Sequence, residues 1–362
     1  MRIGLFIDTE NIGGAEVMVL ELASLIKQSK NTPVLLHFGN EYIKNYAEKH
    51  HIESHVVPFT QHYKKMSALP LYALSIRAFL KKISLDCLHS HLYGPIIAMG
   101  LASFFAGIKH VGTLHDVYTI EERESRIYPL KLVSFLGTKL IAVSTPMKKY
   151  YDDIGSFSPK TITHIANFAP TLQAINDRSQ LRKSIGLEAQ HKVVFSVGRL
   201  VELKQFDILI RAAKNLSSDT RVVIVGNGPE YQKLENLVKE ENVNDRIIFL
   251  GERDDVEQLL QVADVFTLVS RTEGLSRSIL EALSAGLPIV ASDVGGNSDL
   301  IENDKNGVLI KLEQIDTVGK VIQQLLENNE KLQTMGSISL ELSKSKFSSE
   351  NFIRQHLAIY KN

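Results

Sequence analysis

Short apolar runs alternate with amphipathic stretches along almost the whole chain of 362 residues. Arg2–Ile7 and Lys192–Val197 have the length and composition of buried strands, whereas Ala15–Gln28 and Leu71–Ile83 repeat their apolar residues with the period of a helix. Parallel strands need such helices between them, because after each strand the chain must return to the end of the sheet where the next strand begins. The alternation therefore predicts doubly wound, parallel α/β architecture.

A polar stretch from Asn167 to Gln180 divides this alternation into two series. The chain length also suits two domains. We expect two Rossmann-like domains, residues 1–168 and 169–345, facing a central cleft, with a C-terminal helix at about 346–362 that can pack back on the first. The remaining expected strands are Pro33–Phe38, Ser54–Phe59, Leu85–Ser90, His110–Leu114, Lys139–Ser144, Arg221–Val225, Arg246–Leu250, Asp264–Val269, Pro288–Ala291 and Gly307–Ile310.

The composition argues against several classes of protein. Lys and Arg together number 41, as do Asp and Glu, so net charge gives no sign of a nucleic-acid partner. A single cysteine, Cys87, excludes an internal disulfide and a CxxC metal site and favours a reducing cytoplasm. We recognise no signal peptide or membrane-spanning run, and we expect Gly94–Ile108 to form a buried helix.

Two cations follow the expected strand Lys192–Val197. Gly198, which follows this strand, lets the backbone come close to a ligand. Arg199 and Lys204 come next, on the loop and at the start of the following helix. A planar guanidinium and a mobile ammonium suit a diphosphate. Solvated surface charges remain an equal alternative on spacing alone. Further along, Gly226-Asn227-Gly228-Pro229 joins a strand to a helix, for which a plain turn is the simpler interpretation.

Two glutamates, Glu273 and Glu281, flank the start of another helix, at about Ile279–Ala285. Ser278 and Glu281 fit a capping box, in which Glu281 would cap its own helix. That interpretation leaves Glu273, in the preceding polar loop, unexplained. A loop carboxylate beside backbone amides can bind a polyhydroxylated group, with the helix N-terminus facing phosphate.

The first domain offers fewer candidates. Gly13 and Gly14 join its first strand and helix without the G-x-G-x-x-G fingerprint, which argues against a nicotinamide or flavin oxidoreductase. His89 and His91 could bind a metal, but no third ligand has the right spacing, so a structural role is the safer expectation. His115, followed by Asp116, suits acid–base or hydroxyl contacts at a strand end.

These segments together resemble the retaining glycosyltransferases of family 4, which have the two-domain GT-B architecture. The similarity covers nearly all of residues 191–312 and is looser before them. It rests on the following segments: VGRL…K, IVGNGPE…L, IIFLG, ADVF…S…EGL…ILEALSAGLPIVASDVGG, ENDKNGVLI, GGAE…LELA, DCLHSHL, TLHD and AVS. One departure is Ile165-Ala166-Asn167-Phe168, where many relatives have an I-P-N-G segment.

The resemblance implies roles for individual residues. Glu273 would contact the donor sugar, Glu281 the ribose, and Arg199 and Lys204 the diphosphate, with His115 at the reacting end. We count Arg199, Lys204, His115 and Glu273 as catalytic. The predicted donor-binding residues are Gly14, Gly198, Gly226, Gly274, Leu275, Ser276 and Glu281.

The expected reaction transfers a hexosyl or N-acetylhexosaminyl group from a nucleotide-diphosphate sugar to a glycan or lipid-linked acceptor, with retention, in bacterial cell-surface polysaccharide biosynthesis. The chain contains no Asp-x-Asp, so we expect no metal and no other cofactor. Two alternatives stay open: a GT-B nucleotide-sugar 2-epimerase, which needs catalytic carboxylates that we cannot assign, and a non-catalytic nucleotide-sugar-binding subunit.

A basic segment suggests a peripheral contact with an anionic membrane at the inner face of the cytoplasmic membrane. Residues 54–85 contain no acidic residue, and they alternate apolar and basic positions with helical period. A helix packed on the sheet with a solvated basic rim is the alternative. The basic residues are Lys64, Lys65, Arg77, Lys81 and Lys82.

Overall fold

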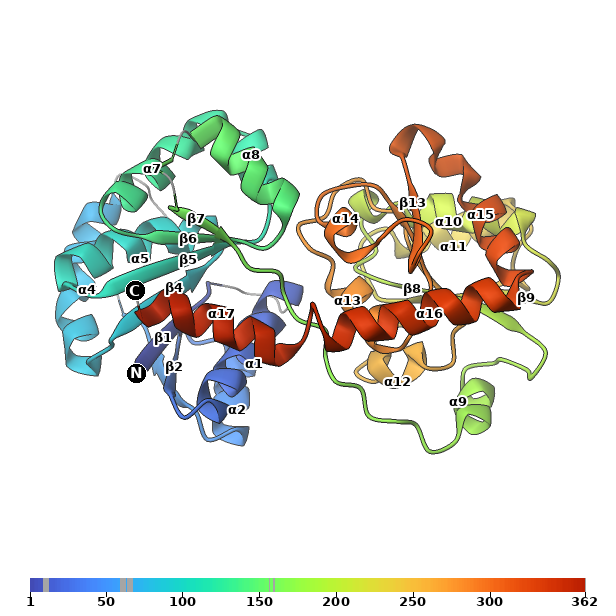
Figure 1. Ribbon diagram of the computed structural model, residues 1–362, viewed down its shortest axis with the longest axis horizontal. Coiled ribbons are helices and arrows are strands. Elements are labelled where there is room, and N and C mark those ends of the chain that lie inside the picture. The colour runs from blue at the N-terminus through green and yellow to red at the C-terminus, as the bar shows by residue number, and fades with distance from the viewer. Residues whose placement is uncertain (9–12, 59–62, 64–67, 156, 159, 362) are drawn as a thin grey trace. The chain divides into compact units, whose positions relative to one another are not determined.

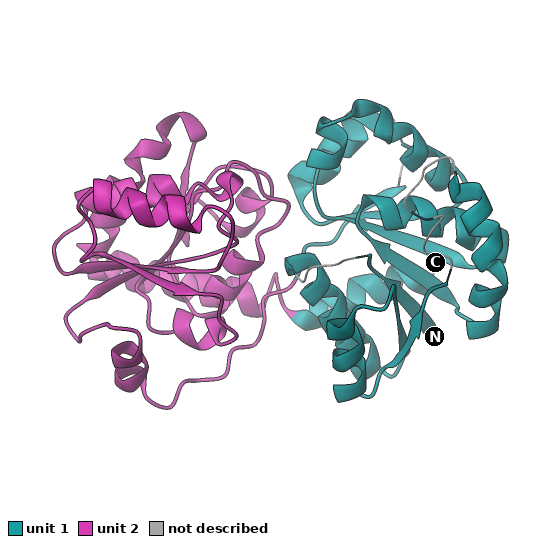
Figure 2. Cartoon of the chain, turned by 180° about the vertical axis from the view of Figure 1, so that it is seen from behind, with its two compact units in different colours: residues 1–167, 349–362 teal, residues 168–348 magenta. Residues whose placement is uncertain are grey.

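The computed structural model of the protein describes residues 1–8, 13–58, 63, 68–155, 157–158 and 160–361. The chain forms two compact units (Figures 1 and 2). Unit 1 consists of residues 1–167 and 349–362, and unit 2 of residues 168–348. The chain thus crosses between the units twice, because its C-terminal helix belongs to unit 1.

Unit 1 is built on a seven-stranded parallel sheet with the order β3-β2-β1-β4-β5-β6-β7. Its strands are β1 (Arg2–Phe6), β2 (Thr32–His37), β3 (Glu53–Val56), β4 (Cys87–His91), β5 (Lys109–Leu114), β6 (Lys139–Ala142) and β7 (Ile162–His164). The helices are α1 (Gly14–Gln28), α2 (Glu41–Lys49), α4 (Leu69–Ile83), α5 (Tyr93–Ala106), α6 (Tyr118–Glu121), α7 (Ile127–Phe135), α8 (Thr145–Gly155) and α17 (Ser349–Lys361).

Five strands of unit 1, β1, β2, β4, β5 and β6, are mostly buried because helices cover both faces of a parallel sheet, whereas the edge strand β3 is exposed or half-buried. β4 is buried along its whole length, and α5 buries most of the apolar run that we expected to be a buried helix. The short strand β7 escaped the sequence analysis. Its three residues, Ile-Thr-His, contain no apolar run that a pattern could detect.

Unit 2 has a six-stranded parallel sheet with the order β10-β9-β8-β11-β12-β13. The strands are β8 (Lys192–Val197), β9 (Thr220–Val225), β10 (Ile247–Gly251), β11 (Val265–Leu268), β12 (Ile289–Ser292) and β13 (Gly307–Ile310). The α-helices are α9 (Arg178–Ser184), α10 (Phe206–Ala212), α11 (Tyr231–Glu240), α12 (Val256–Leu260), α13 (Arg277–Ser284), α14 (Asn297–Leu300), α15 (Val318–Leu326) and α16 (Asn329–Lys344).

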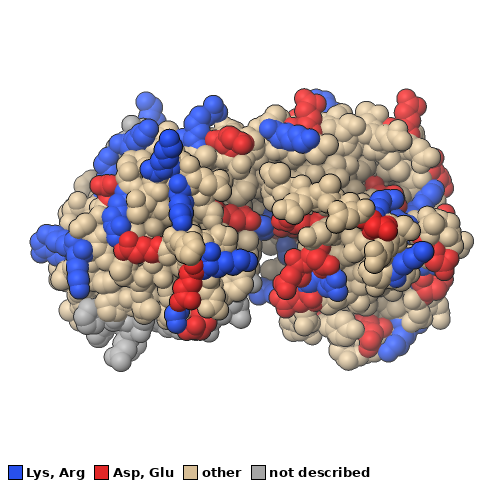
Figure 3. Space-filling view, turned by 90° about the horizontal axis from the view of Figure 1, so that it is seen from below, with Lys and Arg blue, Asp and Glu red and all other residues tan. Residues whose placement is uncertain are grey.

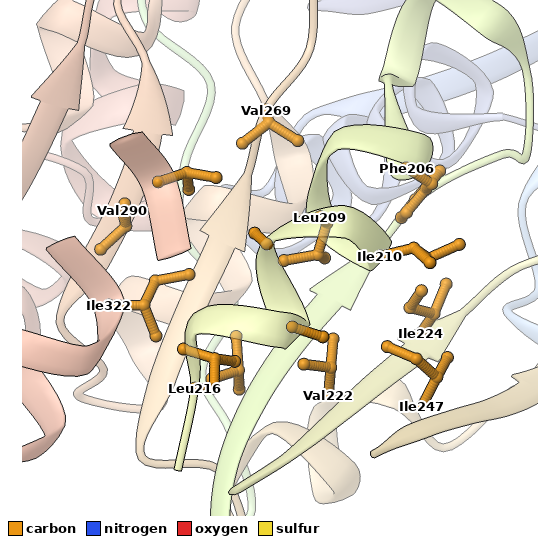
Figure 4. Close-up of a cluster of buried hydrophobic side chains, with 14 of the residues drawn as sticks. Phe206, Leu209, Ile210, Leu216, Val222, Ile224, Ile247, Val269, Val290 and Ile322 are labelled. Atoms are coloured by element: carbon orange, nitrogen blue, oxygen red, sulfur yellow. The ribbon is translucent and has the colours of Figure 1, made fainter. Parts of the chain in front are cut away.

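The core of unit 2 lies between this sheet and the helices α10, α11 and α15 (Figure 4). Leu209 and Ile210 of α10 are fully buried against Val222 and Ile224 of β9. Ile322 of α15 closes the same cluster. Burial of an aliphatic side chain contributes about 1.5–3 kcal/mol, so this packing fixes the strand ends that carry the candidate site.

The surface carries no single-sign charge field on the face that Figure 3 shows, where both units display basic and acidic side chains. This distribution agrees with equal numbers of cationic and anionic residues. No helix within the described part of the chain has the length and apolar character needed to cross a membrane.

Candidate functional site

The strand order fixes where a ligand site can form in each unit. In unit 2 the chain runs outward from β8 to β9 and β10, and then returns to the other side of β8 with β11. The strand order therefore reverses between β8 and β11, and in open parallel sheets ligands bind at the carboxyl ends of the two strands beside such a reversal. The predicted residues Arg199, Lys204 and Glu273 follow these two strands.

Lys204 and Glu273 meet at this switch point. The ammonium of Lys204 lies 2.6 Å from Oε1 of Glu273, and the side chains are 25% and 9% exposed. A Cβ added to Gly198 would lie 3.8 Å from Cδ of Lys204, so the lysine passes over the glycine. The structure thus brings three predicted residues together, although they come from two different strand ends.

Arg199 lies in the same loop with an exposed side chain. Among the described residues it forms no ion pair. The loop itself is held in place, because the backbone amide of Arg271, after β11, donates to the carbonyl of Leu203 at 2.8 Å. The guanidinium of Arg199 is therefore exposed on a backbone that the neighbouring loop holds, whereas Lys204 is paired with Glu273.

Glycines allow the neighbouring loops to pack against this site. A Cβ on Gly226, whose φ is +138°, would lie 2.0 Å from the carbonyl oxygen of Gly198. A Cβ on Gly228 would lie 2.3 Å from that of Leu200. The Gly-x-Gly sequence after β9 is thus more than a plain turn, since it lets the β9 loop support the loop that carries Arg199.

A glycine in the loop after β12 likewise allows close packing against the backbone of Glu273. A Cβ on Gly295 would fall 1.7 Å from the Glu273 carbonyl oxygen, and the amide of Gly296 donates to the carbonyl of Gly274 at 3.0 Å. The loop after β12 therefore holds the backbone of the loop after β11. Leu275 and the Ser276 side chain are buried behind it.

The capping-box interpretation of Glu281 is wrong. Helix α13 begins at Arg277, and its N-cap is Ser276, whose hydroxyl accepts from the amide of Ile279 at 3.3 Å. Glu281 thus stands beyond the first turn, too far along the helix to cap it. Its Oε1 instead accepts from Nε of Arg277 at 2.8 Å, and only 11% of the Glu281 side chain is exposed.

Arg277 is a residue that the sequence analysis missed. Its position four residues before Glu281 is a signal for an ion pair on one helix face, and it was available in the sequence. The pair neutralises a nearly buried carboxylate, which would otherwise be costly to bury.

In unit 1, Gly14 is the first residue of α1, next to the exposed Gly13. The carboxylate of Glu16 accepts from the Gly13 amide at 2.9 Å. The N-terminus of α1 therefore already has an internal anion. Residues 9–12, which begin this glycine loop, lie outside the described residues.

His115 follows β5 and lies beside a second histidine. Its Nε2 is 3.1 Å from Nδ1 of His91, which ends β4. Burial lowers the pKa of His115 to about 4, and the nearby Asp116 opposes this shift. Oδ1 of the neighbouring Asp116 accepts from the amide of Thr119 at 2.9 Å.

His89 and His91 have hydrogen-bond partners and ring neighbours within unit 1. Within the described residues, no three His, Cys, Asp or Glu side chains are arranged to hold a metal ion. Nδ1 of His89 lies 2.7 Å from the hydroxyl of Tyr360, and Nε2 lies 2.7 Å from that of Thr113. These contacts give His89 the structural role that the sequence favoured.

Two family models match the chain. "Glycosyltransferase Family 4" matches residues 12–171, and "Glycosyl transferases group 1" matches residues 177–340. Together they cover most of both units.

The curated relatives support the same family. The chain is 33% identical over 264 residues to the Escherichia coli UDP-Gal:alpha-D-GlcNAc-diphosphoundecaprenol alpha-1,3-galactosyltransferase, which covers 67% of each protein. It is 26% identical over 362 residues to the N-acetyl-alpha-D-glucosaminyl L-malate synthase of Bacillus anthracis, which covers 97% of this chain and 94% of that protein.

Among solved structures, Anabaena HepE in complex with UDP and glucose superposes with a TM-score of 0.87 at 23% identity. The comparison covers 100% of this chain and 99% of HepE. The same fold occurs in a glycosyltransferase from Rickettsia africae ESF-5, with a TM-score of 0.87 at 18% identity over 99% of this chain and 97% of that one. The chain therefore belongs to the group 1 glycosyltransferases of the GT-B architecture.

Proposed function

We propose that this glycosyltransferase transfers a hexosyl or N-acetylhexosaminyl group from a nucleotide-diphosphate sugar to a glycan or lipid-linked acceptor, with retention of the anomeric configuration. The observation that carries the proposal is the contact of Lys204 with Glu273 at the switch point of unit 2. One side of this site is cationic and the other is a carboxylate. It thereby offers partners for both halves of a sugar diphosphate.

The cations stabilise the departing nucleoside diphosphate. When the bond from the anomeric carbon to the leaving oxygen breaks, its electron pair stays on the β-phosphate. Lys204 and Arg199 supply positive charge for that phosphate, and loss of one such contact costs about 2–4 kcal/mol of transition-state stabilisation. Sugar hydroxyls then donate to Glu273, while Glu281 accepts from the ribose hydroxyls.

The relatives support a role in cell-surface glycan biosynthesis. The Escherichia coli relative is named for transfer of galactose to a diphosphoundecaprenol-linked sugar, and other relatives are named for lipopolysaccharide core and O-antigen biosynthesis. We therefore propose a lipid-linked or glycan acceptor and a uridine-diphosphate donor as the first candidates. No metal ion is part of the proposed reaction.

A thermal-shift screen of UDP, GDP, ADP and CDP, with their sugars, tests this function. A ligand at 100 times its dissociation constant stabilises the folded protein by about 2.7 kcal/mol, so tight binders raise the melting temperature. The shift should shrink in Arg199→Ala and Glu281→Ala but persist in Lys305→Ala, which changes an exposed residue elsewhere in unit 2. Equal shifts in all four proteins would contradict the site.

We also propose a peripheral contact between unit 1 and an anionic membrane. Helix α4 buries Tyr72 and Ile76, and it exposes the apolar Leu71 and Leu74 beside its cations. The exposed cations are Arg77, Lys81 and Lys82. Lys64 and Lys65 lie outside the described residues.

Helix α7 adds an apolar face to the same unit. Tyr128, Leu132 and Phe135 repeat with helical spacing and are 69%, 51% and 88% exposed. Helix α5 packs against both α4 and α7. Exposed apolar and cationic side chains suit the interface of an anionic bilayer.

Sedimentation with liposomes tests this contact. We expect binding to vesicles of phosphatidylglycerol and phosphatidylcholine, but not to phosphatidylcholine alone. Binding should fall with salt, and also in the triple variant Arg77→Gln, Lys81→Gln, Lys82→Gln. The matched control is a triple variant of unit 2, in which Lys233, Lys305 and Lys331 are replaced by Gln. It changes the net charge of the protein by the same amount. Equal binding by both variants would contradict the proposal.

A further inference from the structure

A line of buried histidines leads from the C-terminal helix to His115. The rings of His356, on α17, and His89, on β4, have centroids 5.7 Å apart, and those of His89 and His91 are 4.2 Å apart. His91 then contacts His115 through the 3.1 Å nitrogen–nitrogen distance. His89 and His91 are 0% and 2% exposed, so the middle of this line is shielded from bulk solvent.

The contact between His91 and His115 requires one proton between two nitrogens. Desolvation lowers the pKa of His91 well below its ordinary value and that of His115 to about 4, so both rings are neutral at pH 7. A neutral imidazole carries one proton, on either of its two nitrogens. Either His91 Nδ1–H donates to His115 Nε2, or His115 Nε2–H donates to His91 Nδ1.

The far side of His91 distinguishes these two arrangements. Its Nε2 is buried and has no hydrogen-bond partner among the described residues. In the second arrangement this atom would carry a proton, which leaves a buried N–H donor without an acceptor. Orphaned buried N–H groups are rare in folded proteins. The first arrangement leaves only a bare lone pair there, with no proton to accommodate.

We infer that His91 is a positioning residue that donates from Nδ1 to His115 and thereby holds His115 in the tautomer with its proton on Nδ1. The hydrogen bond of the His115 side chain within the described part of the chain is at Nε2, and the residue keeps part of its surface exposed. His115 therefore presents its Nδ1–H as a hydrogen-bond donor to an oxygen atom of a bound ligand. Its Nε2 is occupied and does not serve as a general base.

Nitrogen-15 NMR of protein labelled in its histidine rings tests the tautomer directly. At pH 7.5 we expect Nε2 of His115 to give the signal of an unprotonated nitrogen and Nδ1 that of a protonated one. In His91→Phe the donor is lost, and His115 gains the Nε2–H form. His91→Asn retains an amide at the position of Nδ1 and should restore the wild-type signals, whereas His91→Gln should not.

Tyr360→Phe provides the structural control. This variant removes the hydroxyl that contacts His89 but leaves His91 in place, so the histidine line is disturbed while the His115 signals stay those of the wild type. A proton on Nε2 of His115 in the wild type would overturn the inference, and so would unchanged His115 signals in a folded His91→Phe protein.

The kinetic consequence rests on the proposed function. Loss of one orienting hydrogen bond should lower kcat/KM by about tenfold in His91→Phe, with recovery in His91→Asn. A failure of the proposed function and a failure of this inference are distinguishable. If no nucleotide sugar is turned over, the function is wrong, and the nitrogen signals still decide the tautomer. Unchanged kcat/KM in an active, folded His91→Phe protein contradicts the role assigned to His91.

Discussion

At the residue scale, the site of unit 2 depends on one ion pair that serves two purposes. Lys204 neutralises Glu273, whose side chain is only 9% exposed, and the same two groups are the proposed partners of the donor. Removal of one partner leaves the other charge poorly solvated. Stability and activity can therefore be separated by combining variants.

We expect Lys204→Met to lower the free energy of unfolding by about 1–3 kcal/mol, less than for a fully buried pair, because Lys204 is 25% exposed. Glu273→Gln should cost less, and the double variant less than the sum of the two. Urea unfolding measures these values. A purely additive double variant would show that the pair does not couple.

Activity should not follow stability in this series. Each single variant is expected to lose about 100- to 1,000-fold in kcat, because each loses a transition-state contact. The double variant regains stability without regaining activity, since neither group remains. Steady-state kinetics with the donor found by the binding screen measures this difference. Recovery of activity in the double variant would assign the pair a purely structural role.

At the scale of elements, the loops after β8 and β9 act as one support, because Gly226 lets their backbones touch. We expect Gly226→Ala to destabilise unit 2 by more than the roughly 1 kcal/mol that a left-handed backbone costs, since the new Cβ would meet the Gly198 carbonyl at 2.0 Å. Thermal unfolding compares this variant with Gly186→Ala.

Gly186 is a matched control because its φ is +78° and a Cβ there meets nothing within 4 Å. The difference between the two variants therefore measures the steric contact together with the greater backbone strain of an alanine at φ +138°. Equal destabilisation would mean that the two loops move apart freely, and Gly226 would then have no role in holding Arg199.

The sequence predicted the bounds of these elements where burial produces a recognisable pattern of apolar residues. β8 and β13 begin and end at the predicted residues, because strands covered on both faces appear as continuous apolar runs. The start of α13 was misplaced, since both Ser276 and Ser278 are good N-caps. The choice between them depends on where the preceding loop is held, which the loop after β12 decides.

At the scale of the whole molecule, α17 is far from β4 in the chain but belongs to the same unit. Tyr360→Phe leaves Nδ1 of the fully buried His89 without its 2.7 Å partner, which should cost about 1–3 kcal/mol. Hydrogen exchange should show faster opening of β4 and β5, with β8 and β9 unchanged as the internal control. Equal changes in both units would contradict this assignment of α17 to unit 1.

Acid should destabilise unit 1 before unit 2. Burial lowers the pKa of six unit 1 histidines: His110 to about 3, His115 and His356 to about 4, His89 and His91 well below the ordinary 6.5, and His37 below it. The unfolded state then binds more protons, so their contribution is complete above about pH 6.5 and is lost as the pH falls towards the folded values.

Each of these histidines contributes a slope of up to about 1.4 kcal/mol per pH unit in that window. Unit 2 contains a single histidine, His191, and serves as the reference. Hydrogen exchange at pH 7.5 and pH 5, corrected for the intrinsic exchange rate, should show a greater loss of protection in β4 and β5 than in β8 and β9. Equal losses would contradict the neutral state of the buried histidines.

The sequence by itself determined the parallel α/β architecture, most strand positions and the residue types of the proposed donor site, because burial period and loop chemistry are local properties. The four-residue spacing of Arg277 and Glu281 also indicated an ion pair on one helix face. The sequence could not determine that Lys204 meets Glu273 or that His91 contacts His115, because each of these contacts joins residues at the ends of two different strands. Strand order and loop packing decide them, and these arise only when the whole sheet has formed.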